Sequence, residues 1–308
     1  MKSAMAATRL EATGPFVERM GWLARLADYW TLTKPEVNFL VIMSALAGFY
    51  LGWRGPLDLL LLANTLIGTL LVASGTGTLN QYMERVSDAS MRRTAQRPLP
   101  SGRMAPAAAL GFGILLSVAG GALLWLAVNP LSSVLALLTL GTYLLFYTPL
   151  KKRTPLCTLV GAFPGAAPPL IGWAAARGSL SLEAWVLYAI LFVWQFPHFL
   201  AIAWMYREDY TRAGLLMLPP HDADGRFTAR EILAFTMALL PLSLVPVALG
   251  QVGMIYLIGA LALGLIFLVY GIRLARFRTG ALARQVMLAS VIYLPIVYAL
   301  MMVNKIAA

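Results

Sequence analysis

One uncharged stretch decides the fold, and it runs from Ala105 to Leu150 as APAAALGFGILLSVAGGALLWLAVNPLSSVLALLTLGTYLLFYTPL. A helix needs about 20 apolar residues to cross the hydrocarbon layer of a bilayer, so this stretch is long enough for two helices. The pair Asn129-Pro130 is expected to separate them, because proline cannot continue the hydrogen bonding of a helix. The apolar residues follow one another without alternation, which is typical of membrane helices and excludes a β-barrel.

Other uncharged runs extend this pattern to nine predicted membrane helices. Ile232–Ile272 is also long enough for two, with a break near Gly250-Gln251. The other five helices are expected within Val37–Trp53, Leu59–Met83, Thr154–Ala176, Ala184–Tyr206 and Gln285–Asn304. Only 12% of the 308 residues are charged, against about 25% in soluble domains. We therefore predict an all-α polytopic membrane protein, whose domain of nine transmembrane helices spans residues 35–304 and surrounds a central cavity open to the cytoplasmic side.

The positive charges predict the orientation in the membrane. The net charge is +11, and all but three of the 24 Lys and Arg residues fall on one side if the N-terminus is cytoplasmic; the exceptions are Arg54, Arg177 and Lys305. Loops on the cytoplasmic side of a membrane are enriched in these residues. We expect a multi-pass protein of the bacterial inner membrane, with the C-terminus periplasmic; a mitochondrial inner membrane is the less favoured alternative. Because topology accounts for the basic excess, the lipid bilayer is a predicted partner and nucleic acid is not.

Residues 1–34 are expected to form a cytoplasmic N-terminal segment, and no cleavable signal sequence is evident in it. Within it, Phe16, Met20, Leu23, Ala27 and Trp30 would share one stripe of a helix over residues 16–30, with Glu18, Arg19, Arg25 and Asp28 opposite. This pattern predicts a helix that lies on the membrane surface. Further along, the run Phe163–Pro169 (FPGAAPP) is expected to interrupt the fifth membrane helix and to line a cavity.

Chemistry is concentrated at the predicted end of the second membrane helix. Asn80, Glu84 and Asp88 are spaced by four residues, which places them on one helix face about 6 Å apart along the axis. Oxygen ligands of this kind suit a hard divalent cation such as Mg²⁺. Arg92, Arg93 and Arg97 follow at once, and guanidinium groups are suited to clamping phosphate oxygens. The alternative is a solvated helix end whose arginines only set the topology.

The same residues carry a resemblance to a known family. Asn-x-x-x-Glu-x-x-x-Asp, followed by Arg-Thr-x-x-Arg-Pro-Leu-Pro-Ser-Gly, resembles the first signature of UbiA-type intramembrane prenyltransferases, in the version of the haem O synthases. The resemblance covers about residues 30–303. Further matching segments are Leu32–Pro35, Tyr147–Pro155, Gly161–Ala166, Pro168–Trp173, Trp194–Phe199, Tyr206–Tyr210 and Ala213–Pro219. Trp194–Phe199 (WQFPHF) is the most specific of these, because it separates the haem branch from the quinone branch.

The resemblance implies a reaction in which farnesyl diphosphate, haem B and water give haem O and diphosphate. It implies Mg²⁺ held by Asn80, Glu84 and Asp88, together with a second acidic motif at Glu208 and Asp209. Two departures from the family pattern are visible. Glu36 stands where a basic residue is expected, and Met205-Tyr206 stands where quinone enzymes keep another Asp, so the number of metal ions is left open.

Four further positions are candidates for the reaction. The ring of Tyr147 could stabilise an allylic cation while Lys151 and Lys152 hold diphosphate; the alternative for Tyr147 is an ordinary interfacial tyrosine. An ionisable group inside a membrane helix is a functional candidate by default. His198 could be an axial ligand of the haem iron, a base for the water that is added, or a hydrogen-bonded structural residue. His221 is expected to be solvated, and Cys157 to serve packing.

Other functions remain as alternatives. The nearest is an aromatic prenyltransferase of quinone synthesis, which the Trp194–Phe199 block disfavours. A transporter or haem carrier is disfavoured by the odd number of helices, since two inverted halves are the usual basis of alternating access. A structural scaffold would not need carboxylates beside arginines. A haem A synthase is a conceivable docking partner on which the sequence is silent.

Overall fold

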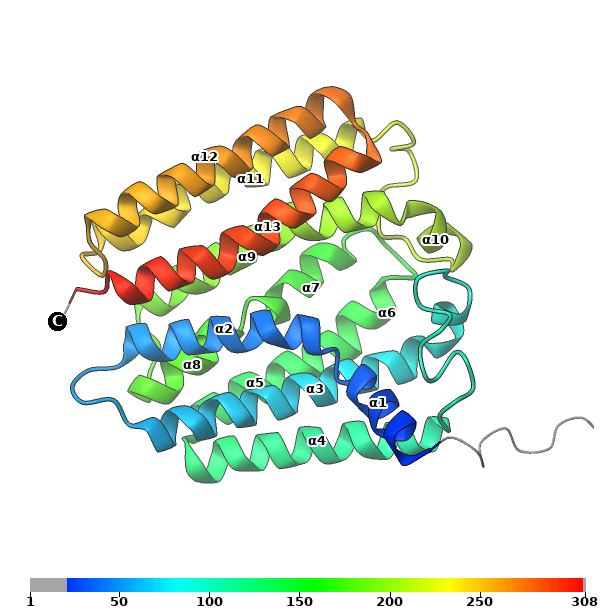
Figure 1. Ribbon diagram of the computed structural model, residues 1–308, viewed down its shortest axis with the longest axis horizontal. Helices are drawn as coiled ribbons and strands as arrows, with labels where there is room; N and C mark the ends of the chain where they lie inside the picture. The colour runs from blue at the N-terminus through cyan, green and yellow to red at the C-terminus, as the bar shows by residue number, and fades with distance from the viewer. Residues whose placement is uncertain (1–20, 307–308) are drawn as a thin grey trace, which may run out of the picture.

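The structure is a computed structural model, and it describes residues 21–306. The described chain is helical, with these elements in order: α1 (Trp22–Leu32), α2 (Pro35–Gly52), α3 (Leu59–Ala89), α4 (Pro106–Ala127), α5 (Pro130–Thr142), the π-helical turn η2 (Tyr143–Tyr147), α6 (Thr148–Leu150), α7 (Cys157–Gly165), α8 (Pro168–Arg177), α9 (Leu182–Met205), α10 (Arg207–Arg212), α11 (Arg226–Ala248), α12 (Met254–Phe277) and α13 (Gly280–Val303). Figure 1 shows the long helices running side by side in one bundle.

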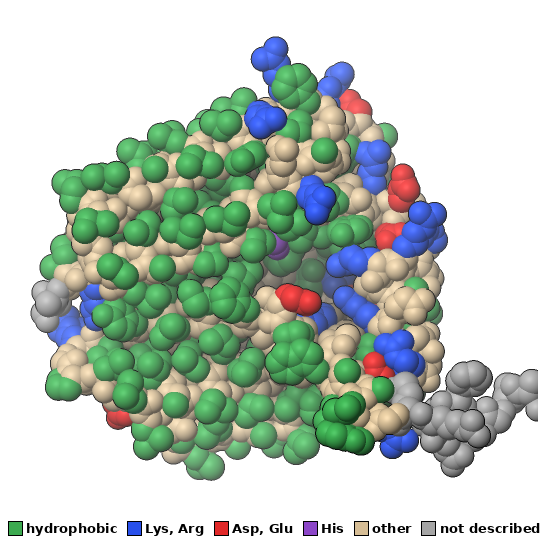
Figure 2. All heavy atoms as spheres, in the orientation of Figure 1, with side chains coloured by type: hydrophobic (Ala, Val, Ile, Leu, Met, Phe, Trp, Pro, Cys, Tyr) green, Lys and Arg blue, Asp and Glu red, His purple; other side chains and the backbone are tan. Residues whose placement is uncertain are grey.

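Nine helical segments of the described chain are long and apolar enough to cross a membrane, as predicted. The segment Pro130–Leu150 consists of α5, η2 and α6, and Cys157–Arg177 consists of α7 and α8. The predicted breaks at Asn129-Pro130 and Gly250-Gln251 are present, because α4 ends at Ala127 and α11 at Ala248. Apolar side chains cover the sides of the bundle in Figure 2, where a soluble protein would be polar.

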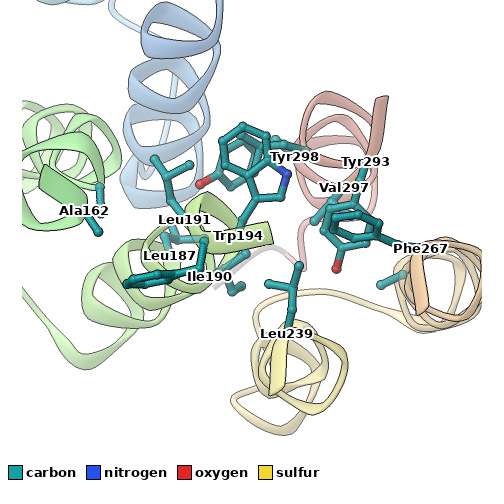
Figure 3. Packing of buried hydrophobic residues seen from close by; sticks show 14 of the residues in the cluster. Ala162, Leu187, Ile190, Leu191, Trp194, Leu239, Phe267, Tyr293, Val297 and Tyr298 are labelled. Carbon is teal, nitrogen blue, oxygen red and sulfur yellow. The ribbon is translucent and has the colours of Figure 1, made fainter. Parts of the chain in front are cut away.

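The helices close a ring. Along the chain α2 packs on α3, α3 on α4 and α4 on α5; α9 then packs on α11, α11 on α12 and α12 on α13, and α13 returns to both α9 and α2. Buried aromatic residues fill the second half of this ring. Trp194 of α9 packs among Tyr293, Val297 and Tyr298 of α13 (Figure 3).

The fifth membrane helix is interrupted as predicted. α7 ends at Gly165, and α8 begins at Pro168. Near the break, the carbonyl oxygen of Ala162 accepts a hydrogen bond from the backbone N–H of Ala166 at 3.0 Å and a second one from the side chain of Gln195 on α9 at 3.1 Å. A Cβ atom at Gly165 would lie 2.0 Å from Oε1 of Gln195. Gln195 therefore packs directly against Gly165, and a larger residue at this position would require the glutamine side chain to shift.

α1 is helical where part of the surface helix is predicted, and its position on the membrane stays a prediction; Phe16, Glu18, Arg19 and Met20 lie outside the described residues. Trp22, Leu23 and Trp30 of α1 are exposed, with 64–70% of their surface free. Asp28, on the opposite face, is buried and accepts hydrogen bonds from Arg103 at 3.0–3.3 Å. Asp28 and Leu32 of α1 therefore pack on the protein, and the exposed apolar side chains of α1 lie on its other face.

α2 and α8 approach each other through glycines. A Cβ atom at Gly48 would lie 2.1 Å from the carbonyl oxygen of Pro169, and one at Gly172 would lie 1.9 Å from that of Ala45. Because the obstructing atoms belong to backbone, they cannot move aside by a change of rotamer. Small residues that allow helix backbones to approach are the usual basis of packing in membranes.

Gly172→Ala should therefore destabilise the bundle. Overpacking costs about 1–3 kcal/mol, so the thermal midpoint in detergent should fall. Gly141→Ala is the matched control, since Gly141 also lies within a membrane helix but a Cβ atom there would meet nothing within 4 Å. Equal midpoints for the two variants would contradict the packing argument.

Candidate active site

Lys and Arg side chains gather at one end of the bundle, on the right in Figure 2, around a hollow in the surface. We call this the basic end. It comprises residues 90–105 between α3 and α4, residues 151–156 after α6, α10, and the turn between α12 and α13. Every residue predicted to handle diphosphate lies here, although the segments are far apart in the sequence.

The face of α3 that carries the predicted ligands turns into the protein. Asn80 and Asp88 are each 1% exposed, and 11% of the Glu84 side chain is free. α3 continues to Ala89, beyond the predicted membrane segment that ends at Met83. Glu84 and Asp88 therefore sit on rigid helix rather than in a loop.

Each of these three side chains accepts a hydrogen bond from a cation. Nζ of Lys34 donates to Oδ1 of Asn80 at 2.6 Å, and Nζ of Lys151 donates to Oε1 of Glu84 at 2.7 Å. Arg97 donates to Oδ2 of Asp88 at 2.8 Å. The row of oxygen atoms on α3 is thus faced by a row of positive charges that comes from three other segments. We call these six residues the α3 network.

Tyr147 and Lys151 are positioned by an irregular stretch of backbone. Tyr147 ends the π-helical turn η2, and Nζ of Lys151 lies 4.4 Å from the centre of its ring. A Cβ atom at Gly161 of α7 would lie 2.5 Å from this ring, so only glycine leaves room for it. A π-helical turn inside an α-helix is rare and is frequently found at functional sites. Lys152 is exposed and takes no part in the α3 network.

The second predicted acidic motif is split between two environments. Asp209 is buried, and it accepts hydrogen bonds from the backbone N–H of Arg93 at 3.3 Å and from the side chain of Arg212 at 3.0 Å. Burial opposes ionisation, but the backbone N–H groups of Arg93 and Arg92 and the charge of Arg212 outweigh it and hold the pKa of Asp209 below its ordinary value. Glu208 is exposed. Asp209 therefore fixes the backbone of the arginine segment to α10.

Arg93 lies against aromatic rings. Its guanidinium carbon is 4.9 Å from the centre of the Tyr206 ring and 5.9 Å from that of Tyr210. Nη2 of Arg93 also donates a hydrogen bond to the hydroxyl of Tyr210 at 3.3 Å. Tyr206 is one of the two residues that depart from the quinone-enzyme pattern. With a ring in place of a carboxylate, the cation is held without being neutralised.

The described residues contain no group of three or more His, Cys, Asp or Glu side chains placed to hold a metal ion by themselves. The donor chemistry nevertheless fits Mg²⁺. This ion usually keeps several waters and binds through one or two carboxylates together with the phosphates of a substrate. Glu84 and Asp88 are two such carboxylates, with the amide oxygen of Asn80 one turn away.

Lys34 was missed as a site residue, although its segment was noted. It precedes the first residue of α2 with φ 54° and ψ 62°, a left-handed conformation that is uncommon outside glycine. Burial, followed by the positive charge of Arg97, lowers its pKa to about 7. A lysine in front of proline at the start of a helix was the available signal, but nothing in the sequence placed its Nζ beside Asn80.

His198 is held by Ser290 of α13. Its Nδ1 lies 2.8 Å from Oγ of Ser290, and that hydroxyl donates its proton to the carbonyl oxygen of Met287 at 2.6 Å. Because the hydroxyl has one proton, it can only accept from the imidazole, which assigns the proton to Nδ1. Nε2 then carries the free lone pair. Trp194 stacks on the imidazole at 4.8 Å and donates to the carbonyl oxygen of Ser290 at 2.8 Å.

Two other sequence expectations concern residues outside the network. His221 is exposed, as expected. Cys157 is buried and contacts the carbonyl oxygen of Leu216 and the sulfur of Met217, which agrees with a packing role. Ser290, which no pattern in the sequence singled out, is the second residue that sequence reasoning missed.

Residues 41–297 match the model of the UbiA prenyltransferase family. A protein of Solibacter usitatus named protoheme IX farnesyltransferase is 53% identical over 289 residues, which cover 91% of this chain and 99% of that protein. Among solved structures, a digeranylgeranylglyceryl phosphate synthase has a TM-score of 0.75 at 18% identity, covering 91% of this chain and 98% of that one. A UbiA homologue of Archaeoglobus fulgidus bound to GPP and Mg²⁺ has a TM-score of 0.60 at 15% identity, and the match covers 89% of this chain and 99% of that one.

The lowered pKa of Lys34 predicts unusual reactivity. In the ligand-free protein, acetylation of this amine should follow a midpoint near pH 7, and Arg97→Gln should move the midpoint upward because a repelling charge is gone. Peptide mass spectrometry after brief labelling at each pH measures the extent of acetylation of Lys34, and the same peptide in the unfolded protein is the control. Between pH 7 and 10.5 the unfolded chain binds more protons at Lys34, so the contribution of this residue to stability should rise with pH. If acetylation of Lys34 in the folded protein followed the pH dependence of an ordinary lysine, the lowered pKa of Lys34 would be contradicted.

Proposed function

The chain belongs to the UbiA prenyltransferase family, and we propose that it transfers the farnesyl group of farnesyl diphosphate to a vinyl group of haem B, with addition of water, to give haem O and diphosphate. The relative from Solibacter usitatus named for this activity supports the substrates, since the two chains match over nearly their whole lengths. The observation within the molecule that carries the proposal is the α3 network, in which oxygen ligands and cations alternate at one end of a membrane bundle.

The α3 network can exchange partners when a diphosphate and its metal ion enter. Glu84 and Asp88, with Asn80, would turn from their cations to Mg²⁺, and the released Lys34, Lys151 and Arg97 would turn to the phosphate oxygens. Glu84, Asp88, Lys151 and Arg97 would each have an oppositely charged partner before and after the exchange, so none of these four charges would be left unpaired. A bound diphosphate would also favour the protonated form of Lys34. The predicted roles of Arg92, Lys152, Glu208 and Asp209 at this site stay predictions.

Departure of the diphosphate is the step that these residues assist. Bound Mg²⁺ supplies positive charge to the diphosphate as the allylic C–O bond breaks. Lys151 and Arg97 bind the leaving group more strongly as its charge grows, which lowers the barrier rather than only the binding energy. The ring of Tyr147, beside Lys151, is suited to face the allylic cation. A haem vinyl carbon then attacks this cation, and water adds to the vinyl carbon left electron-deficient.

His198 is suited to hold the haem that presents this vinyl group. The hydrogen bond to Ser290 leaves Nε2 unprotonated, which is the form that ligates iron. The same atom could accept a proton from the added water, so both functional roles of His198 use one tautomer. We place the reaction at the basic end and propose that this end faces the cytoplasm of a bacterium, across its inner membrane.

The test is a reconstitution of the purified protein in lipid nanodiscs with haem B, farnesyl diphosphate and Mg²⁺, followed by mass analysis of the haem. We expect haem O, and no prenylated product when a phenolic acid replaces haem B. A prenylated phenol would instead support the quinone enzyme. Transfer of haem between vesicles without any prenylated haem would support a carrier.

Asp88→Asn should lower kcat by about 100-fold or more, which is the usual effect of losing one electrostatic contact to a transition state. The amide can still accept the hydrogen bond from Arg97, so the fold should persist. Asp224→Asn is the matched control, because Asp224 also pairs with an arginine but is exposed. Removal of Mg²⁺ by a chelator should abolish the activity of the wild-type protein. Full activity of Asp88→Asn at saturating Mg²⁺ would refute the role of this carboxylate.

His198→Ala should lose haem affinity and change the Soret band while farnesyl diphosphate still binds. Ser290→Ala should weaken haem binding by about 10- to 100-fold, as is typical when the residue that orients a metal ligand is removed, and Ser290→Thr should restore it. Ser243→Ala is the matched control: Ser243 of α11 is equally buried, bonded to the carbonyl oxygen of Leu239 and to the hydroxyl of Tyr293, but not to His198.

The same variants separate the three roles of His198. An unchanged spectrum with failed hydration would indicate a base. Loss of expression, or loss of binding of both haem and farnesyl diphosphate, would indicate a structural histidine. Normal product formation by His198→Ala would refute both functional roles.

A further inference from the structure

A cavity at the basic end lies outside the α3 network and has four arginines in its wall. Its volume is about 640 Å³, and it lies between the end of α9, the start of α13 and the segment that follows α3. The arginines are Arg92, Arg93, Arg207 and Arg278. In the part of the chain that the structure describes, none of the four makes a salt bridge. They contribute positive charge that no carboxylate of the described chain neutralises by direct contact.

The acids of the cavity do not cancel this charge. Two carboxylates line it, Glu208 and Asp209. Asp209 is already engaged by Arg212 and by the backbone N–H of Arg93. The cavity therefore retains an excess of positive charge, and an anionic group with more than one negative charge would complement it.

Two of the arginines are held in place without an anion. The guanidinium carbon of Arg207 lies 4.3 Å from the ring centre of Trp204, a residue that is 8% exposed. Arg278 follows the last residue of α12 with φ 49°, a left-handed conformation that usually belongs to glycine, and its guanidinium donates to the carbonyl oxygen of Ala275 at 3.3 Å. Backbone strain at a charged residue is typical of positions kept for function. Both guanidinium groups keep donors free for a carboxylate.

The cavity is aligned with His198. α9 carries His198 and ends beside Arg207, and α13 carries Ser290 and begins beside Arg278. At 1.5 Å per residue, Met205, the last residue of α9, is about 10 Å from His198 along the helix, and Gly280, the first residue of α13, is about 15 Å from Ser290. Half of a porphyrin, a propionate chain and an arginine side chain together are of this length. An iron-bound haem at His198 can thus reach the cavity with its carboxylates.

We propose that this cavity binds the two propionate groups of haem through Arg207 and Arg278. The proposal rests on the proposed function, because it assumes that haem B is the substrate. Propionates and vinyl groups occupy opposite edges of the porphyrin. Anchoring the propionates therefore fixes the rotation of the macrocycle and leaves the vinyl edge on the side of the porphyrin away from this cavity, free to meet the allylic carbon. The arginines act on orientation and affinity, and the α3 network acts on the diphosphate.

The test compares haem B with its dimethyl ester, in which both propionates lack charge. The wild type should bind the diester at least about tenfold more weakly, which corresponds to the loss of one charge-assisted hydrogen bond. The double variant Arg207→Gln/Arg278→Gln should bind haem B more weakly than the wild type by at least the same factor. Its affinity for the diester should equal that of the wild type. Spectroscopic titration in nanodiscs measures both, and KM for farnesyl diphosphate should not change.

Arg276→Gln is the matched control, because Arg276 lies in the last turn of α12 against Phe277 and outside the cavity. Equal binding of haem B and its diester by the wild type would overturn the proposal without any variant. Equal weakening of haem B and the diester in the double variant would also overturn it. A raised KM for farnesyl diphosphate, with haem binding unchanged, would assign the cavity to diphosphate instead.

A failure of the proposed function is a different result. In that case the wild type would form no haem O, whichever haem binds. If the double variant does not fold, Arg207→Lys and Arg278→Lys offer a milder test. Each keeps the charge but lacks the planar pair of donors that a carboxylate matches. The affinity for haem B should therefore still fall relative to the affinity for the diester.

Discussion

A charge placed inside a membrane bundle must have a partner, and the structure at the basic end follows from this constraint. On α3 the oxygen atoms of Asn80, Glu84 and Asp88 face Lys34, Lys151 and Arg97, which come from three separate segments. Such a row holds these segments together in the ligand-free protein. It also keeps the carboxylates and the cations in the positions where a metal ion and a diphosphate would need them. On the proposed function, the contacts that hold these segments together would also prepare the site for its substrate.

Irregular backbone supports this arrangement in a region where regular helix is the rule. The π-helical turn η2 lies directly before Thr148, whose hydroxyl accepts a hydrogen bond from Asn80 at 3.2 Å. Gly161 leaves room for the ring of Tyr147, and the break between α7 and α8 is covered by Gln195. Irregular backbone at membrane depth is tolerated only where other groups satisfy its hydrogen bonds. In η2 the carbonyl oxygen of Tyr143 accepts a hydrogen bond from the hydroxyl of Thr148, and near the break that of Ala162 accepts one from Gln195 of α9, so side chains supply such bonds at both irregularities.

The sequence predicts the fold well because the bilayer imposes length and composition on each helix. The nine membrane segments, the break before Pro168 and the single face of Asn80, Glu84 and Asp88 all follow from local patterns. The partners across the bundle do not. Lys34 lies 46 positions from Asn80, and Ser290 lies 92 positions from His198. A serine in a membrane helix usually bonds its own backbone, and Ser290 does so too, so nothing local marks it as the partner of a histidine.

One axial ligand cannot orient a haem by itself. A bond from Nε2 of His198 to iron fixes one point and the plane of the macrocycle, but rotation about that bond would bring either vinyl group, or neither, to the allylic carbon. A second contact at the edge of the ring removes this freedom, because the porphyrin carries its carboxylates on one side only. Arg207 and Arg278 lie at the ends of the two helices that hold His198 and Ser290, so the edge contact and the axial contact would belong to one rigid unit. The pairing of α9 with α13, which Trp194 reinforces through its hydrogen bond to Ser290, then becomes the part of the fold that sets which edge of the porphyrin faces the allylic carbon.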